Sequence, residues 1–194
     1  MNQTISYYNE HAEEYCAATV GADMSFCRDR FMAFLPAGAH ILDAGCGSGR
    51  DSKVFLKKGF IVTAMDASEK MCGEAEKLLG QDVLRCTFQE MNFQNAFDGI
   101  WACASLLHVA KSEINSVMKN LKRALKPGGI IYVSFKYGTG ERTAQRRLFH
   151  DYDESSLRML LENCEFAVCD IFITEDVRET RQGEKWVNAI ARMP

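Results

Sequence analysis

Three glycines at alternate positions form the segment of this chain that is best suited to hold a ligand. They occupy positions 45, 47 and 49, directly after the strand-like run 41–44 and before a segment with helical spacing. Glycine lets the backbone turn sharply and lets a ligand approach without meeting a Cβ atom. Free N–H groups at the start of the following helix favour anionic or polar ligand atoms. The stretch therefore predicts a ligand-binding turn between a strand and a helix.

A carboxylate follows this turn at a distance that suits ribose recognition. Asp66 ends the next apolar run and lies 21 residues after Gly45. A carboxylate at that place can accept hydrogen bonds from both hydroxyls of a ribose. The alternative is that Asp66 caps the next helix, a role that Ser68 can fill equally well. We predict that the glycine turn and Asp66 together bind one nucleoside.

The spacing of the glycines distinguishes two classes of nucleotide ligand. The dinucleotide fingerprint is G-x-G-x-x-G, whereas this chain has G-x-G-x-G, and Arg50 stands where the third glycine would pack helix against strand. The spacing argues against NAD, so a dehydrogenase is the least favoured interpretation.

Short apolar runs alternate with segments of helical spacing, which is typical of βαβ units and a parallel sheet. Five strands are predicted at residues 39–44, 60–65, 82–86, 97–103 and 129–136. A helix that Asp153 or Ser155 could cap follows them, and β-like runs at 166–174 and 185–192 predict a terminal antiparallel hairpin. Two amphipathic segments precede the first strand, at 5–15 and 24–35.

Length and composition predict one soluble domain. The chain has 194 residues, of which 47% are apolar and 25% charged, so it can bury one sizeable core and has no tract typical of a linker. Acidic residues among the first thirty, such as Glu10, Glu13, Glu14 and Asp23, exclude a signal peptide, and the longest nearly apolar run, 100–110, is far shorter than a membrane span. We expect a cytoplasmic protein without membrane contact.

The cysteines and histidines lack the spacing of a metal site. None of the eight cysteines forms a C-x-x-C pair, and the four histidines form no H-x-x-x-H pattern. We expect no metal, and cysteines that pack as small reduced hydrophobes. The net charge of −3 opposes general affinity for nucleic acid, because phosphate neutralisation needs a positive contact face.

The order of the motifs resembles that of the class I S-adenosylmethionine-dependent methyltransferases. In that family an acidic residue stands two positions before the first glycine of G-x-G-x-G, as Asp43 does here. The resemblance runs from about residue 8 to the C-terminus and implies a three-layer Rossmann-like α/β sandwich, whose seven-stranded, mostly parallel sheet has an antiparallel last strand. It also implies one domain over 1–194, with residues 1–36 as a helical cap over the cofactor.

The resemblance implies S-adenosylmethionine as the cofactor. Asp66 is similar to the family's ribose-binding acid, and 87–89 to the segment at the adenine edge. Thr87 stands where relatives often have Asp, so recognition of the adenine amino group would depend on backbone groups or Gln89. The cofactor contacts that the resemblance implies are Tyr8, Asp43, Ala44, Gly45, Cys46, Gly47, Arg50, Asp66, Ala67, Met71, Thr87, Phe88, Gln89 and Cys103.

Methyl transfer from a sulfonium is an in-line displacement, so the enzyme mainly aligns the nucleophile with the methyl group and excludes water. A hydroxyl acceptor also needs a general base, and the candidates near the strand ends are His108, Lys136 and Tyr137. The alternative for His108 is a structural role beside the cofactor.

Cations after the fifth strand indicate where an acceptor could bind. Arg142, Arg146 and Arg147 follow that strand, and Arg178 lies in the loop before the last strand. They form either an anion-binding lip or a solvated surface helix with ordinary charges. A small-molecule acceptor with a carboxylate or phosphate is the first hypothesis. RNA or protein methylation, with the arginines as a docking patch, is the second, and a cofactor-binding protein without transfer activity is the third.

Overall fold

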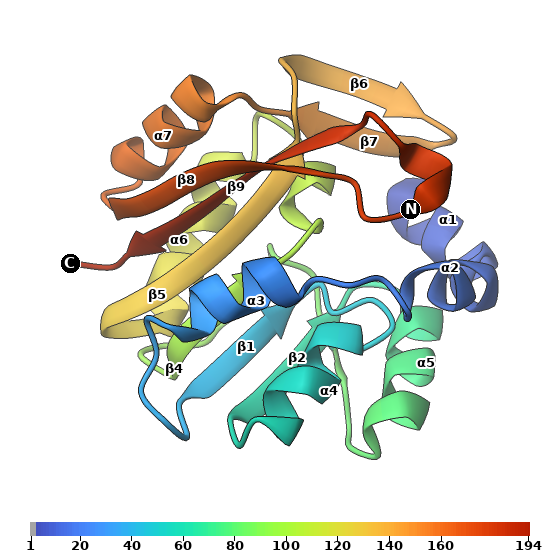
Figure 1. Ribbon diagram of the computed structural model, residues 1–194, viewed down its shortest axis with the longest axis horizontal. Helices are drawn as coiled ribbons and strands as arrows, with labels where there is room; N and C mark the ends of the chain where they lie inside the picture. The colour runs from blue at the N-terminus through green and yellow to red at the C-terminus, as the bar shows by residue number, and fades with distance from the viewer. Residues whose placement is uncertain (1–2) are drawn as a thin grey trace.

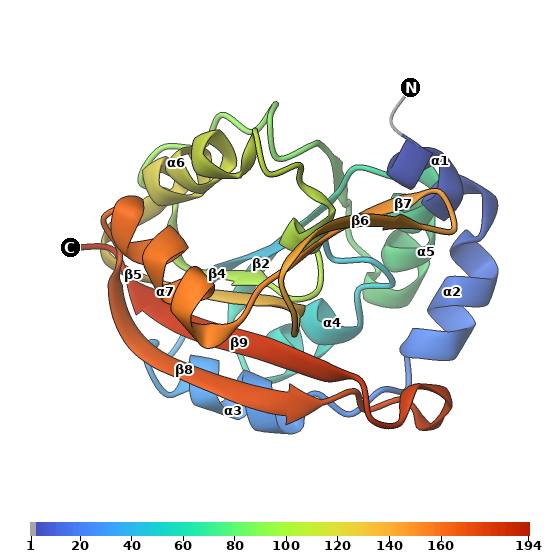
Figure 2. The same ribbon diagram turned by 90° about the horizontal axis from the view of Figure 1, so that it is seen from above.

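The computed structural model describes residues 3–194, apart from the side chain of Glu179, and arranges them as helices on both faces of a central sheet (Figures 1 and 2). The sheet has seven strands in the order β3-β2-β1-β4-β5-β9-β8. The first five are parallel, and β9 is antiparallel to both of its neighbours. The bounds are β1 His40–Ala44, β2 Ile61–Asp66, β3 Leu84–Arg85, β4 Phe97–Ala102, β5 Leu125–Lys136, β8 Ala167–Glu175 and β9 Lys185–Arg192.

Alternate residues of the central strands enter two different cores. Trp101 and Tyr132 stack at 3.9 Å between ring centroids on the face that is covered by α3 (Ser25–Met32), α4 (Arg50–Lys57) and α5 (Glu69–Leu79). Ile100 and Ile131 point to the face covered by α6 (Ile114–Ala124) and α7 (Glu154–Asn163). Figure 2 shows α3 and α6 on opposite sides of the sheet. Burial on both faces explains why these strands are nearly continuous apolar runs.

The strand order places a crevice at the carboxyl end of β1. The chain runs from β1 through α4 to β2 on one side, whereas β4 pairs with β1 on the other side. Ligands bind at such switch points in open α/β sheets, because the connecting helices diverge to opposite faces there.

The N-terminal helices lie across this crevice rather than on the sheet. Helix α1 (Gln3–Glu10) ends before His11, and α2 (Ala12–Thr19) follows it, so the single amphipathic segment predicted at 5–15 is divided in two. The Asn9 side chain accepts a hydrogen bond from the Ser68 hydroxyl at 2.7 Å, and Thr4 Oγ1 accepts one from the backbone N–H of Leu148 at 3.1 Å. Helix α1 therefore joins α5 to β7 (Arg147–Asp151), beside which it lies in Figure 1.

The interpretation of the segment after β5 as a surface helix was wrong. Residues Gly140–Ala144 form β6, which pairs with β7 as an antiparallel hairpin. Its two turn residues, Gln145 and Arg146, have φ of 50° and 63°, as a type I′ turn requires. Such turns favour Asn-Gly, so the Gln-Arg pair carried no local signal for a hairpin.

The remaining elements agree with the expected ones in type and order, although β3 has two residues instead of the five predicted at 82–86. Asp153 rather than Ser155 caps α7, and its carboxylate accepts from the backbone N–H of Ser156 at 2.8 Å. Strand β5 begins at Leu125, four residues before the predicted start, because Leu125 pairs with Phe97 as soon as α6 ends. No helix within 3–194 is long and apolar enough to cross a membrane.

Candidate active site

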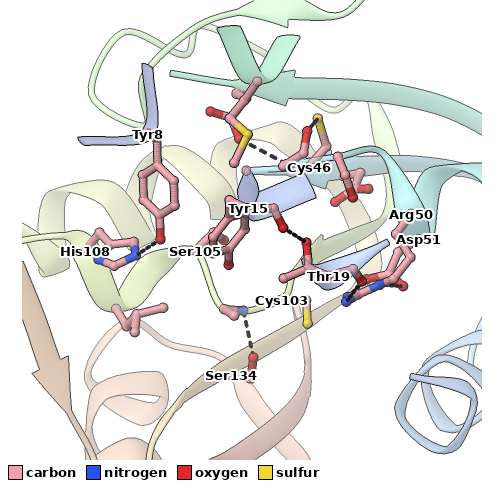
Figure 3. A pocket seen from close by; sticks show the side chains of 18 of the residues that line it. Tyr8, Tyr15, Thr19, Cys46, Arg50, Asp51, Cys103, Ser105, His108 and Ser134 are labelled. Carbon is pink, nitrogen blue, oxygen red and sulfur yellow. Dashed lines mark hydrogen bonds and ion pairs between the residues drawn. The ribbon is translucent and has the colours of Figure 1, made fainter. Parts of the chain in front are cut away.

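A cavity of about 600 Å³ lies at the carboxyl ends of β1, β2, β4 and β5 (Figure 3). Its walls include the glycine turn, the segments after β2, β3 and β4, and residues of α1, α2 and β7. The volume lies within the range of about 300–1,000 Å³ that is usual for small-molecule sites.

The glycine turn brings the backbone against the segment that follows β4. Gly45 has φ of +83°, and its N–H donates to the carbonyl of Met65 at 2.9 Å. A Cβ atom at Gly45 would lie 2.4 Å from Cβ of Ser105, whose hydroxyl donates to the carbonyl of Ala44 at 2.7 Å. Only glycine fits there, for both its conformation and its size.

Asp66 lies at the end of β2 with its carboxylate at the cavity wall. One carboxylate oxygen accepts from the N–H of Gly47 at 3.0 Å, and the other accepts from the N–H of Ser68 at 2.9 Å. Burial raises the pKa of Asp66, although the hydrogen bonds from these N–H groups oppose the shift. Ser68, not Asp66, caps α5, since its hydroxyl accepts from the N–H of Met71. Each carboxylate oxygen has a further lone pair, which a ribose hydroxyl can use.

Asp43 is a second acidic residue of the cavity wall, and it is buried. The Ser52 hydroxyl donates to it at 2.6 Å. Burial raises the pKa of Asp43 to about 7, and the negative charge of Asp51 adds to the shift. A cationic ligand group close to Asp43 would favour its ionised form.

A buried ion-pair network around Asp51 forms one side of the cavity, and sequence reasoning missed this residue. Asp51 accepts from Arg28 and from Arg50, both at 2.6 Å, and from the indole N–H of Trp101 at 3.0 Å. Burial alone would raise the pKa of Asp51, but the two arginines hold it below its usual value. Figure 3 shows Arg50 turned toward Asp51. The Arg50 guanidinium is therefore held within the cavity wall by a carboxylate of its own chain.

His108 and Tyr8 meet on the other side of the cavity. Nδ1 of His108 lies 2.6 Å from the carbonyl oxygen of Leu148, so Nδ1 carries the proton and donates. Nε2 accepts from the Tyr8 hydroxyl at 2.8 Å (Figure 3). Burial lowers the pKa of His108 to about 4. His108 is thus neutral at physiological pH, and its Nε2 lone pair is occupied by the hydrogen bond from Tyr8.

The structure places most of the predicted cofactor contacts around one cavity. Thirteen of the fourteen line it, and the other, Ala44, is buried in the core toward α6, with its carbonyl held by Ser105. The cavity-lining set is Tyr8, Asp43, Gly45, Cys46, Gly47, Arg50, Asp66, Ala67, Met71, Thr87, Phe88, Gln89 and Cys103.

The predicted bases and acceptor contacts divide into two groups. His108, Lys136 and Arg178 line the cavity, but Lys136 is held by the carboxylates of Asp176 and Glu184, so its ammonium is not placed as a base. The other three predicted residues do not line the cavity. Tyr137 is 42% exposed, Arg142 pairs with Asp151, and Arg146 pairs with Glu10.

Residues 42–133, which contain the glycine turn, Asp66 and His108, match a family model described as a methyltransferase domain. These residues are similar to a methyltransferase domain, and the chain has the fold of the class I S-adenosylmethionine-dependent methyltransferases. The chain is 33% identical over 103 residues to a ubiquinone biosynthesis O-methyltransferase of Coxiella burnetii, a match that covers 50% of this chain and 43% of the relative. It is also 33% identical over 107 residues to a malonyl-[acyl-carrier protein] O-methyltransferase of Enterobacter lignolyticus, covering 53% and 42%. These matches span less than half the length of either curated relative.

A solved methyltransferase has the same fold. The 1,6-didemethyltoxoflavin-N1-methyltransferase of Burkholderia thailandensis, with bound 1,6-didemethyltoxoflavin and S-adenosylhomocysteine, superposes with a TM-score of 0.83. The superposition covers 98% of this chain and 87% of that chain at 23% identity, so the likeness is one of fold.

The residues of the cavity fit an adenosyl sulfonium ligand. The turn at Gly45 has no side chain that would fill the crevice, and Asp66 offers acceptors for hydroxyl groups. Met71 and Phe88 supply apolar surface beside them for a base. The rings of Tyr8 and Tyr15, 5.1 Å apart, offer aromatic faces, which attract a cation.

Proposed function

We propose that this protein transfers the methyl group of S-adenosylmethionine to a small-molecule acceptor. The proposal rests on one observation, that the two ends of a single cavity are lined by residues of different chemistry. The glycine turn and Asp66 form one end, at β1 and β2, and Tyr8, His108 and Phe149 form the other, beyond β4. A nucleoside held at the first end leaves the second end for an acceptor.

The bound cofactor supplies a methyl group on a positively charged sulfur. The protein's own residues hold the two reactants in line and keep water out. Helix α1 covers the cavity, because Asn9 holds it to α5 and Tyr8 holds it to His108. Neutral His108 can take up, at Nε2, a proton that an acceptor hydroxyl or amine releases once Tyr8 turns away.

Two features favour a small acceptor over RNA or protein. The acceptor end is covered by α1 and α2, which restricts access for a macromolecule. Arg142 and Arg146, the exposed arginines of the β6–β7 hairpin, are each paired with a carboxylate and so offer no free basic face to a phosphate backbone. The names of two curated relatives state O-methylation, in ubiquinone biosynthesis and of malonyl-[acyl-carrier protein].

The test is transfer of label from methyl-labelled S-adenosylmethionine into a cell extract separated into small metabolites, RNA and protein. We expect label in the small-metabolite fraction with the wild-type protein and, at a cofactor concentration below saturation, much less with Asp66→Ala. Label in RNA or protein would instead support the second hypothesis, methylation of RNA or protein. Tight binding of S-adenosylhomocysteine without label in any fraction would leave a cofactor-binding protein without transfer activity.

A further inference from the structure

Arg147 is a buried cation in the wall of the cavity. It begins β7, directly after the hairpin turn, and is 8% exposed. Its guanidinium carbon lies 4.3 Å from the ring centroid of Tyr7, 5.9 Å from that of Tyr8 and 5.2 Å from that of Phe149. Three aromatic rings therefore surround the group that carries the positive charge.

No carboxylate among the described side chains pairs with Arg147. One of its terminal nitrogens donates to the amide oxygen of Gln145 at 2.7 Å, and the buried Nε has no hydrogen-bond partner in residues 3–194. The other arginines that line the cavity each have a carboxylate, at 2.6 Å for Arg50 and Arg178 and 2.9 Å for Arg181. Arg147 differs from them because its charge has no carboxylate partner and its buried Nε–H has no acceptor among the described residues.

An unpaired buried guanidinium is unfavourable unless something compensates its charge. More than about nine in ten buried polar groups in folded proteins have a hydrogen-bond partner, and a buried charge without a counter-ion costs several kcal/mol. Aromatic faces compensate part of that cost by attracting the positive charge. They offer no oxygen or nitrogen lone pair that could accept a hydrogen bond from Nε–H. The remaining Nε–H and charge are complementary to an anion, because a guanidinium presents its donors as a planar fork.

Arg147 lies at the acceptor end of the cavity, so an anion that it binds would lie there too. Its neighbour Leu148 holds His108 through the backbone carbonyl, and the Phe149 ring lies 5.1 Å from the imidazole. Asp66 and the glycine turn belong to β2 and β1, on the far side of β4 in the sheet order. The free donor of Arg147 is thus grouped with the candidate base rather than with the nucleoside-binding residues.

We propose that Arg147 binds an anionic group of the methyl acceptor, so that the substrate carries a carboxylate or a phosphate. This inference rests on the proposed function, since it concerns the acceptor of the same reaction. Of the four arginines for which the sequence suggested this role, Arg147 is the one that keeps it, because Arg142, Arg146 and Arg178 are each paired with a carboxylate of the chain itself.

The test compares anions with a neutral isostere on the protein saturated with S-adenosylhomocysteine. Benzoate, phenyl phosphate and benzamide are titrated by calorimetry into the full chain. We expect at least one of the two anions to bind about tenfold to a hundredfold more tightly than benzamide, as a charge-assisted fork allows. The anion with the larger preference identifies the class of acid that the substrate carries.

Three variants separate the role of Arg147 from a general effect of charge. Arg147→Gln is expected to lose the preference for the anion and to keep the affinity for S-adenosylhomocysteine within twofold. Arg147→Lys keeps the charge without the fork and should show an intermediate preference. Arg158→Gln is the control, because Arg158 is exposed on α7 and pairs with Glu162.

The proposal is overturned if neither anion binds more tightly than benzamide, or if the preference survives in Arg147→Gln. A tenfold or larger loss of S-adenosylhomocysteine affinity in Arg147→Gln overturns it too, because Arg147 would then hold the cofactor's own carboxylate. The wild-type comparison needs no variant to fold. Failure of the proposed function has a different signature, in which no methyl label is transferred although the anion preference is present.

Discussion

The hydroxyl of Tyr8 donates to Nε2 of His108 across 2.8 Å, although the two residues are 100 positions apart. This hydrogen bond joins α1 to the segment after β4 at the proposed acceptor end of the cavity. The same contact occupies the lone pair that a general base would use, so access of an acceptor to His108 requires Tyr8 to move.

Tyr8→Phe should destabilise the protein modestly, because it leaves the buried Nε2 of His108 without a donor. We expect the free energy of unfolding to fall by about 1–2 kcal/mol, measured by denaturant titration. Tyr7→Phe is the control, since Tyr7 contacts its neighbours through its ring, stacked on His11 at 4.3 Å. Equal losses in the two variants would contradict a specific role of the Tyr8 hydroxyl.

Gly45→Ala should distort the glycine turn. The added Cβ would lie 2.4 Å from Ser105 and would need a φ of +83°, so either the turn or the segment after β4 must shift. We expect at least a tenfold loss of S-adenosylhomocysteine affinity together with a lower melting temperature. Gly73→Ala, in α5 with open space around it, should instead raise stability by about 0.5–1 kcal/mol. Unchanged cofactor affinity in Gly45→Ala would remove the turn from the site.

Asp66→Ala should weaken S-adenosylhomocysteine binding by more than about tenfold, because charge-assisted hydrogen bonds contribute about 1.5–3 kcal/mol each. Calorimetric titration measures the effect. Glu162→Ala, on the exposed face of α7, is the matched control and should bind as the wild type does. An affinity that does not change would show that Asp66 does not contact the ligand.

Asp51→Asn should be among the most destabilising single changes. It removes the charge that compensates Arg28 and Arg50, whose side chains are only 10% and 20% exposed. Removal of one partner from a buried ion pair costs about 3–5 kcal/mol. Asp23→Asn provides the comparison, because Asp23 is exposed and lies 3.8 Å from the same Arg28. A loss no larger than that of Asp23→Asn would contradict the importance of the network.

The titration of His108 should appear in acid solution. Burial lowers the pKa of His108 to about 4, from the usual 6.5, so below pH 6.5 the unfolded chain binds a proton that the folded protein excludes. The stability that this difference contributes is complete above pH 6.5 and is lost as the pH falls toward 4. Proton NMR should show that the imidazole of His108 stays neutral down to about pH 5. A midpoint near 6.5 for His108 would contradict its burial against Tyr8 and Leu148.

The sequence by itself determined the α/β class, the strands of the seven-stranded sheet and the end of the cavity that the glycine turn and Asp66 form. Those features depend on local chemistry. Apolar runs flanked by helical patterns specify strands and crossover helices. Gly45 is required by the conformation and crowding of its own turn, and Asp66 reaches the same turn because parallel β1 and β2 end side by side. Because the ends of these two strands are neighbours in the sheet, the spacing of the residues along the sequence is enough to predict such a site.

Only the tertiary structure decided which charged residues are free to act. Arg146 meets Glu10 from 136 positions away, and Lys136 meets Asp176 from 40 positions away, so both cations are neutralised by carboxylates that no local pattern connects to them. Arg147 looks the same as its neighbours in the sequence, yet folding buries it among aromatic rings without a carboxylate. The reason is that the free energy of a charge depends on its partners and its burial, and both are set by contacts between distant segments.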